Sequence, residues 1–379
     1  MEKSSNKCMD DKILSLSFNQ DYSLFSMGTE KGFKIINAYN LNQGYEKCLF
    51  GGISNCELSY KSNYLALIGG GKVPKFNNKK VVIYNDELDE IESEFKFTVK
   101  ILNVKLKKNM LFIVTEKEIF VFNIQNSQNL DSFETSTNKK GLIAINGNPN
   151  KTILAYPIEF NKQSQKGFVS IKNYETNKCF PQLVQNDKIT AMAMDYEGLL
   201  LATSNEKGTI ICIHSCNDGT LLQECRRGME KADIIFISFD INYKYMGVYS
   251  DRKTIHIWKL ENFIEINRPD KKEKSDSGKQ VRKNELRYSH KKSISTANLS
   301  ENKDNIEIRI KNIKNYKSES SFAKIRINDP YCIFCFKNND VVLIISINGI
   351  YYKAIIDNSG GDCFIYKKKY LREIKFEKD

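Results

Sequence analysis

Short apolar runs alternate with polar turns along nearly the whole chain. Residues 34–37, 81–84, 111–114 and 119–122 are such runs, and the turns between runs are rich in Asn, Gly, Asp and Lys. Runs of this length, bounded by turn residues and rich in β-branched and aromatic side chains, predict β-strands. No amphipathic helix of ordinary length stands out, so the pattern predicts an all-β protein.

One unit of this pattern recurs. Residues 17–36, 193–214 and 238–258 each read as strand, turn, strand, tight turn, strand. Thr209 and Thr254 occupy equivalent places by sequence and are 45 residues apart, which matches the roughly 40–45 residues of a propeller blade. Seven blades and one long insertion account for the chain, so we expect a seven-bladed, WD-repeat-like β-propeller forming one domain over residues 1–379. A closed ring needs no partner to cover its edges, so we also expect a monomer.

The insertion covers residues 261–320, where the sequence turns strongly polar and rich in lysine. Such a composition cannot bury enough apolar area to offset the entropy of ordering the chain. We therefore expect a mobile basic loop that leaves one blade. Within it, residues 306–313 alternate strictly between apolar and polar positions, which favours a pair of strands over an interfacial helix.

Charge narrows the class of partner. The formal net charge is +12 at pH 7, which favours nucleic acid or an anionic membrane surface. A reader of nucleic acid interleaves aromatic and basic residues, whereas the basic segment has only Tyr288 and Tyr316, so we expect no nucleic-acid partner. The chain has no apolar stretch of transmembrane length and no secretory signal at its start, which predicts a cytosolic protein.

Candidate catalytic chemistry is sparse. The ten cysteines have scattered spacings typical of reduced core thiols, and Cys332 and Cys335 fall in an apolar run that reads as a buried strand. With three histidines, no nucleophile elbow, no phosphate-binding loop followed by a helix and no metal-ligand spacing, an enzyme is the least expected class. We expect no catalytic residue, no metal and no cofactor.

The most informative motif is Cys225-Arg226-Arg227-Gly228. Neighbouring side chains of a strand point to opposite faces, so the two arginines can serve two separate anion pockets. Each guanidinium is permanently charged and offers a planar fork of donors suited to phosphate. We expect Gly228 to allow a sharp turn where a side chain would clash. The alternative is a solvated arginine pair on an edge strand.

With these motifs, the chain resembles the PROPPIN family, which comprises the WIPI proteins and their fungal relatives and consists of seven-bladed phosphoinositide-binding propellers of autophagy. The resemblance covers nearly the whole chain. It is carried, in order, by residues 18–21, 28–32, 69–86, 202–209, the Arg-Arg-Gly motif, 321–323 and 349–353. Cys225 stands where the family has Phe or Leu.

The resemblance implies two headgroup pockets on the propeller rim. The first pocket would comprise Arg226, Thr203, Ser204 and Thr209, and the second pocket would comprise Arg227, Ser250, Thr254 and His256. Residues 184–189 lack the histidine that the family supplies to the first pocket. The alternative is that both threonines shape blade turns and that His256 is a packed strand residue.

The resemblance also places the insertion in blade six, where the family's loop contacts the bilayer. The candidate membrane contacts here are Lys271, Lys272, Lys291, Lys292, Ile306, Ile308 and Ile310. We expect lysine attraction to outweigh apolar insertion, because the segment has few apolar residues.

The implied function is that of an effector of phosphatidylinositol 3-phosphate, with the 3,5-bisphosphate as a second candidate ligand. Such an effector would recruit autophagy proteins to autophagosomal precursor, endosomal or vacuolar membranes, with a plastid-type organelle as a further candidate. The alternative is a protein-interaction scaffold with a generic basic surface.

Overall fold

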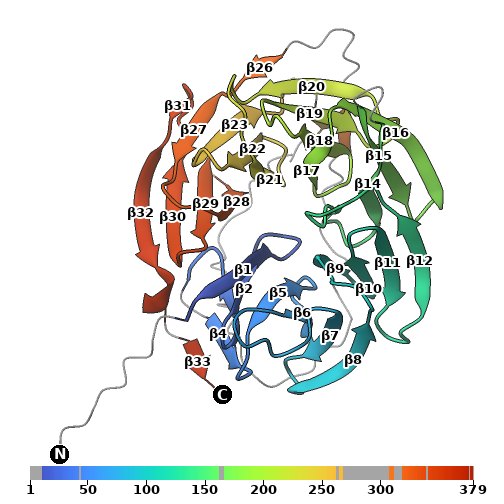
Figure 1. The fold of residues 1–379 in the computed structure, drawn as a ribbon. Coiled ribbons are helices and arrows are strands. Elements are labelled where there is room, and N and C mark those ends of the chain that lie inside the picture. The colour runs from blue at the N-terminus through green and yellow to red at the C-terminus, as the bar shows by residue number, and fades with distance from the viewer. Residues whose placement is uncertain are drawn as a thin grey trace, which may run out of the picture.

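The computed structural model describes residues 11–41, 44–161, 166–261, 264–267, 307–310, 318–338, 340–374 and 376–378. Seven four-stranded antiparallel blades follow one another in chain order around a ring (Figure 1). This confirms the prediction of an all-β, seven-bladed propeller.

The first four blades are built from consecutive strands. Blade one comprises β1 (Ile13–Phe18), β2 (Leu24–Thr29), β3 (Gly32–Asn37) and β4 (Gly44–Cys48). Blade two comprises β5 (Ile53–Leu58), β6 (Tyr64–Gly69), β7 (Lys80–Asn85) and β8 (Glu90–Lys96). Blade three comprises β9 (Asn103–Lys107), β10 (Met110–Val114), β11 (Glu118–Asn123) and β12 (Asn129–Glu134). Blade four comprises β13 (Ala144–Ile145), β14 (Ile153–Asn161), β15 (Lys166–Asn173) and β16 (Lys178–Asn186).

The last three blades include the interrupted one. Blade five comprises β17 (Ile189–Met194), β18 (Leu200–Asn205), β19 (Ile210–Ser215) and β20 (Leu221–Arg226). Blade six comprises β21 (Ile234–Phe239), β22 (Tyr245–Ser250), β23 (Thr254–Lys259) and, after the insertion, β27 (Ala323–Arg326). Blade seven comprises β28 (Cys332–Lys337), β29 (Val341–Ser346), β30 (Ile350–Ile355) and β32 (Phe364–Tyr370). Cys332 and Cys335 are buried in β28, which confirms the interpretation of that run as a buried strand.

Three blades carry a short fifth strand that pairs in parallel with their outermost strand. β26 (Glu319–Ser320) pairs with β20, β31 (Gly361–Asp362) with β27, and β33 (Phe376–Lys378) with β4. The last of these returns the chain to blade one after η1 (Leu371–Glu373), the 3₁₀ turn that follows blade seven. Among the residues that the structure describes, no helix is long and apolar enough to cross a membrane.

The insertion leaves blade six between β23 and β27. Within it, β24 (Ile264–Asn267) and β25 (Glu307–Ile310) form an antiparallel pair, as the alternation of residues 306–313 predicts. Ile310 packs against the core shared by blades five and six and is half-buried there, and its contact with a bilayer stays a prediction. Lys271, Lys272, Lys291, Lys292 and Ile306 lie outside the described residues, as does the side chain of Ile308.

The strand register corrects one sequence equivalence. Four residues connect β18 to β19, whereas three connect β22 to β23. Ile211 faces Ser204 across its hairpin just as Ile255 faces Tyr249, so Thr254 corresponds to Ile210. Thr209 has no counterpart in blade six, because it is the extra residue of the longer turn.

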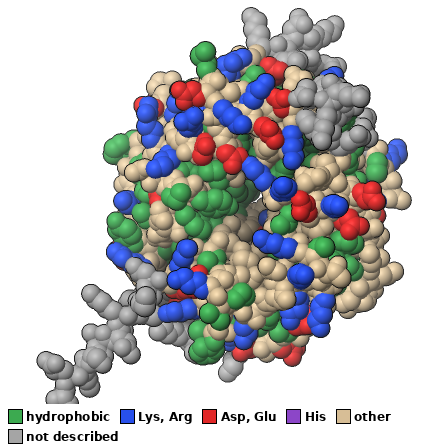
Figure 2. Space-filling model, in the orientation of Figure 1, with side chains coloured by type: hydrophobic (Ala, Val, Ile, Leu, Met, Phe, Trp, Pro, Cys, Tyr) green, Lys and Arg blue, Asp and Glu red, His purple; other side chains and the backbone are tan. Residues whose placement is uncertain are grey.

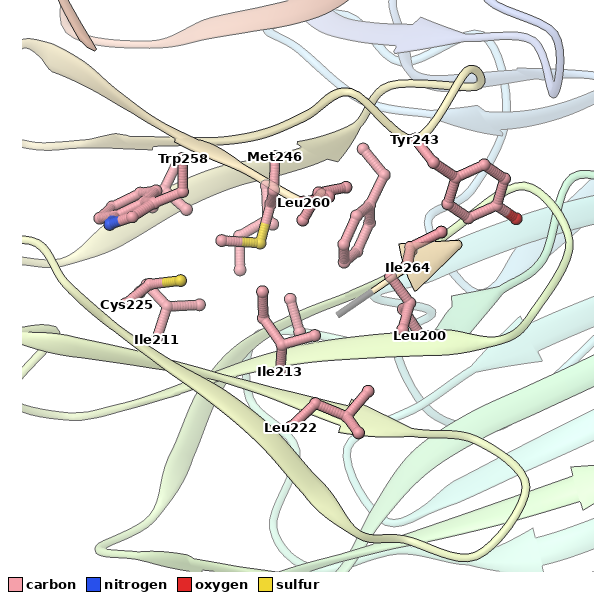
Figure 3. Packing of buried hydrophobic residues seen from close by; sticks show 14 of the residues in the cluster. Leu200, Ile211, Ile213, Leu222, Cys225, Tyr243, Met246, Trp258, Leu260 and Ile264 are labelled. Atoms are coloured by element: carbon pink, nitrogen blue, oxygen red, sulfur yellow. The ribbon is translucent and has the colours of Figure 1, made fainter. Parts of the chain in front are cut away.

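Apolar side chains from neighbouring blades pack together between them. In the cluster between blades five and six, Ile211 and Cys225 face Met246 and Trp258 (Figure 3). Cys225 is buried at the position where a larger Phe or Leu was expected. Blades seven and one close the ring in the same way, and there Tyr351 donates a hydrogen bond to the Ala38 carbonyl over 2.9 Å.

Candidate anion-binding rim of blades five and six

Arg226 and Arg227 belong to different sides of blade five. Cys225 points into the core shared with blade six, so by alternation Arg226 points to the face that blade four covers. Arg226 closes β20 opposite Ile210, and its side chain is exposed. The prediction that the two arginines serve opposite sides is consistent with this register.

Arg227 is latched onto the turn of its own blade. Its backbone N–H donates to the Thr209 carbonyl over 2.8 Å, and its Nε donates to the Gly208 carbonyl over 2.7 Å. One terminal nitrogen donates to the Glu230 carbonyl, and the residue is only 8% exposed. Burial lowers the pKa of this guanidinium, and the positive charge of Arg252 lowers it further.

The glycine that this geometry requires is Gly208 and not Gly228. A Cβ added at Gly228 would meet nothing within 4 Å, so the expected steric clash at that position is wrong. Gly208 has a φ of +60°, and an added Cβ would lie 2.0 Å from the Ala232 carbonyl oxygen. Since L-residues rarely adopt that φ, the turn whose carbonyl accepts from Arg227 Nε favours glycine at position 208.

Blade six supplies the facing wall. In its sheet, Thr254 lies opposite Arg326 and His256 lies opposite Lys324, and all four share the face turned to blade five. Nδ1 of His256 lies 3.1 Å from the Ser321 hydroxyl, and the imidazole stacks on Trp258 at 6.0 Å between ring centroids. Burial lowers the pKa of His256 to about 4, helped by the charges of Lys324 and Arg227.

The residues predicted for the second pocket lie on the facing sides of blades five and six. Arg227 and His256 are close enough for one charge to shift the pKa of the other, and Thr254 lies in the next row of the same sheet face. Ser250 is fully buried, and its hydroxyl has no hydrogen-bond partner among the described residues. Two residues after Val248 in β22, Ser250 shares the sheet face that is turned to blade five.

The residues predicted for the first pocket do not converge in this way. Thr203 and Ser204 are both fully buried, and as strand neighbours they point to opposite faces. Ser204 shares its row with Ile211 and Cys225, on the blade-six side, whereas Arg226 is on the blade-four side. Thr209 lies at the turn, where its carbonyl accepts the Arg227 N–H.

Three cations that adjoin the residues predicted for the second pocket were missed from the sequence, namely Arg252, Lys324 and Arg326. Arg326 occupies in blade six the place of Arg226 in blade five, because Thr254 pairs with Arg326 as Ile210 pairs with Arg226. The signal is the alternation Ala323-Lys324-Ile325-Arg326-Ile327, a strand with one basic and one apolar face. Arg326 lies 3.6 Å from Asp362, and both side chains are exposed.

Charge elsewhere on the visible face of the molecule is mixed. Figure 2 shows lysine and arginine interspersed with aspartate and glutamate over this face, with no large area of one sign. No group of His, Cys, Asp and Glu that could hold a metal ion occurs within the described part of the chain.

Comparison with known proteins places the chain among propellers of this kind. A protein-family model described as PROPPIN matches residues 12–283. Autophagy-related protein 18 of Yarrowia lipolytica is 30% identical over 273 residues, covering 67% of this chain and 68% of the relative. SVP1-like protein 2 of Saccharomyces cerevisiae is 31% identical over 304 residues, covering 68% and 65% respectively. The chain thus spans about two thirds of the length of these relatives.

Solved structures show the same fold. The crystal structure of Kluyvelomyces marxianus Hsv2 superposes with a TM-score of 0.67 at 16% identity, covering 95% of this chain and 99% of the other. A complex of KlAtg21 with the coiled-coil of AgAtg16 gives a TM-score of 0.68 at 19% identity and the same coverage. At these identities the likeness is one of fold.

Proposed function

Because the chain belongs to the PROPPIN family, we propose that it is a non-catalytic effector that binds phosphatidylinositol 3-phosphate at the rim of blades five and six. The 3,5-bisphosphate is a second candidate ligand. The observation that carries the proposal is that Arg227 is held on the blade-six side of blade five, facing the sheet face of blade six where His256 lies opposite Lys324. A guanidinium fork, an imidazole and a threonine hydroxyl are suited to phosphate oxygens.

We assign the two pockets unequal shares of the binding. In the second pocket, Arg227, Thr254 and His256 would contact the headgroup above Ser250. In the first pocket, Arg226 and Thr209 would do so above the buried Thr203, whereas Ser204 lies on the opposite side of the blade from Arg226. Since a charge-assisted hydrogen bond contributes roughly 1.5–3 kcal/mol, one pocket alone would bind weakly. A second pocket on the same rim adds avidity, because the second lipid is captured at high effective concentration.

The lysines of the insertion would add a less specific attraction of about 1 kcal/mol each on an anionic leaflet. Held at the membrane, the propeller would recruit autophagy proteins to autophagosomal precursor, endosomal or vacuolar membranes. Among the similar structures, the KlAtg21 complex contains a coiled-coil segment of a second protein, which supports a recruiting role for this fold.

Vesicle co-sedimentation tests the proposal. The vesicles would contain phosphatidylcholine with phosphatidylinositol 3-phosphate, with the 3,5-bisphosphate, or with phosphatidylserine at equal total charge. We expect the first two to bind the wild-type chain and the double variant Arg226→Thr, Arg227→Thr to bind them at least about tenfold more weakly.

The matched control is Lys100→Thr with Lys117→Thr, which removes the same charge from exposed turns of blades two and three. This control should bind as the wild type does. If instead the wild type and both double variants bind all anionic vesicles alike, the charge is generic and the scaffold alternative replaces the effector.

A further inference from the structure

Two lysines of blade seven lie directly opposite each other on neighbouring strands. Lys353 in β30 pairs in register with Lys367 in β32. Like charges at directly opposed positions destabilise a sheet. A third ammonium joins them, because Lys337 lies over the Tyr39 ring at 5.0 Å while Lys353 donates to the Tyr39 carbonyl over 3.2 Å.

No carboxylate of the described residues compensates this group. Burial lowers the pKa of Lys353, and the charges of Lys337 and Lys367 lower it further, with no opposing contribution from an acid. The Tyr39 hydroxyl points to the backbone of Asp21, but the Asp21 carboxylate accepts from Ser23 and lies 3.7 Å from Lys61. The three lysines thus keep an unfavourable arrangement that an anionic group would relieve.

An exposed apolar group adjoins the lysines on the same face of the sheet. In the next row, Ile355 pairs with Phe364, and Tyr366 follows at the bulge in β32. Phe364 is 74% exposed, and Ile355 and Tyr366 are each 43% exposed. Along this face of β30, Tyr351 is buried against blade one, Lys353 is half-buried and Ile355 is exposed.

The exposed apolar residues of blade seven lie at the opposite end of their blade from the headgroup rim. Arg226 is at the end of the fourth strand of its blade, and the corresponding residue of blade seven is Tyr370, opposite Ile350. Phe364 is at the start of that fourth strand. Since a strand of this length spans roughly 20 Å, Phe364 lies on the other face of the ring from the headgroup pockets.

We propose that Lys337, Lys353, Lys367, Ile355, Phe364 and Tyr366 form a docking surface, the blade-seven surface, for an acidic protein segment. The segment would place a carboxylate between Lys353 and Lys367 and an apolar side chain against Ile355 and Phe364. This deepens the recruiting half of the proposed function by assigning the chemistry of the partner. A membrane is disfavoured as the occupant, because Phe364 lies at the opposite end of its outer strand from the residue that corresponds to Arg226.

Lysines on an outer strand also protect a sheet edge from pairing with other chains. That role requires neither opposed lysines on one sheet face nor exposed apolar side chains beside them. The two roles also predict different behaviour for Lys367→Glu. A docking surface loses its anion site, whereas in the unbound chain the new carboxylate pairs with Lys353 and removes the repulsion.

Selection of a display library of random short peptides against the immobilised full chain tests the proposal. We expect enriched peptides that carry Asp or Glu beside an aromatic or aliphatic residue. Lys367→Glu and Phe364→Ser should each weaken their binding at least about tenfold. The matched controls Lys117→Glu and Leu130→Ser, at exposed positions of blade three, should not.

The melting temperature of Lys367→Glu should equal or exceed that of the wild type, so a loss of peptide binding cannot be ascribed to unfolding. The proposal is overturned if no sequence is enriched, if the enriched peptides lack acidic residues, or if both surface variants bind them as the wild type does. Weaker phosphatidylserine vesicle binding by Lys367→Glu alone would assign the surface to membranes. None of these outcomes bears on the headgroup pockets, which the vesicle assay tests separately.

Discussion

Each side of blade five carries one arginine of the motif, and one of the two is exposed while the other is buried. Arg226 is exposed on the blade-four side, whereas Arg227 is 8% exposed on the blade-six side and held by the Gly208 and Glu230 carbonyls. Strand alternation produces the difference, because the two arginines follow each other in sequence. One motif thus combines a surface cation with a cation that is part of the fold, and only the second is positioned before any ligand arrives.

The largest effect should come from removing that second cation. Arg227→Ala leaves two backbone carbonyls without their charged donor, so we expect the free energy of unfolding to fall by about 2 kcal/mol. Arg226→Ala removes an exposed side chain and should cost within about 0.5 kcal/mol. Urea unfolding followed by the fluorescence of Trp258, the only tryptophan of the chain, measures both.

Arg227→Lys serves as the control, because it keeps the charge and loses the planar fork. It should lose most of the stability that Arg227→Ala loses and retain part of the vesicle binding. Equal stability losses for the Arg226 and Arg227 variants would contradict the asymmetry between the two sides.

The pH dependence of two histidines compares the same two sides. His214 of blade five faces blade four, and His256 of blade six faces blade five. Burial lowers the pKa of both His214 and His256 to about 4, against about 6.5 in an unfolded chain. Between these values the unfolded chain binds more protons, so each histidine makes the fold less stable as the pH falls from 6.5 towards 4. The change that His256→Gln makes to the free energy of unfolding should therefore be more favourable at pH 5 than at pH 7, by on the order of 1–2 kcal/mol.

A phosphate between Arg227 and His256 would oppose the charges that lower the pKa of His256 and so raise it. Affinity should then increase as the pH falls, while the pKa of His214, which faces blade four, stays unchanged. Histidine-resolved NMR titration with and without soluble inositol 1,3-bisphosphate measures both residues in one sample. Equal shifts for the two histidines, or none, would place the ligand outside the second pocket.

Much of this architecture was predictable, since short apolar runs at blade spacing and the alternation of residues 306–313 follow directly from strand geometry. The burial of Cys332 and Cys335 was predictable for the same reason. The exact equivalence of residues between blades five and six was not predictable. Blade five has one extra turn residue, so Thr254 corresponds to Ile210 and not to Thr209. Two adjacent hydroxyls on a strand, Thr203 and Ser204, also cannot both face one pocket.

The roles of glycines and distant cations were beyond sequence reasoning. Gly228 stands in the recognisable motif, yet the steric demand is at Gly208, where the Ala232 carbonyl approaches. Lys324 and Arg326 pair with His256 and Thr254 from beyond a long insertion, so nothing in their local spacing relates them to Arg227. The need for glycine at position 208 and the proximity of these cations both depend on which residues the fold brings together. The periodicity of the sequence does not show this.

The smallest effects should come from the buried hydroxyls beneath the two pockets. Thr203 Oγ1 and Ser250 Oγ are buried without a hydrogen-bond partner among the described residues. Thr203→Val keeps the shape and removes the unpaired group, so we expect a gain of up to about 1 kcal/mol in the free energy of unfolding. Ser250→Ala should gain less, because it also leaves a small void. Since neither hydroxyl reaches the surface, vesicle binding should stay unchanged in both variants. If Ser250→Ala alone weakened vesicle binding, the headgroup would have to reach the Ser250 hydroxyl between blades five and six.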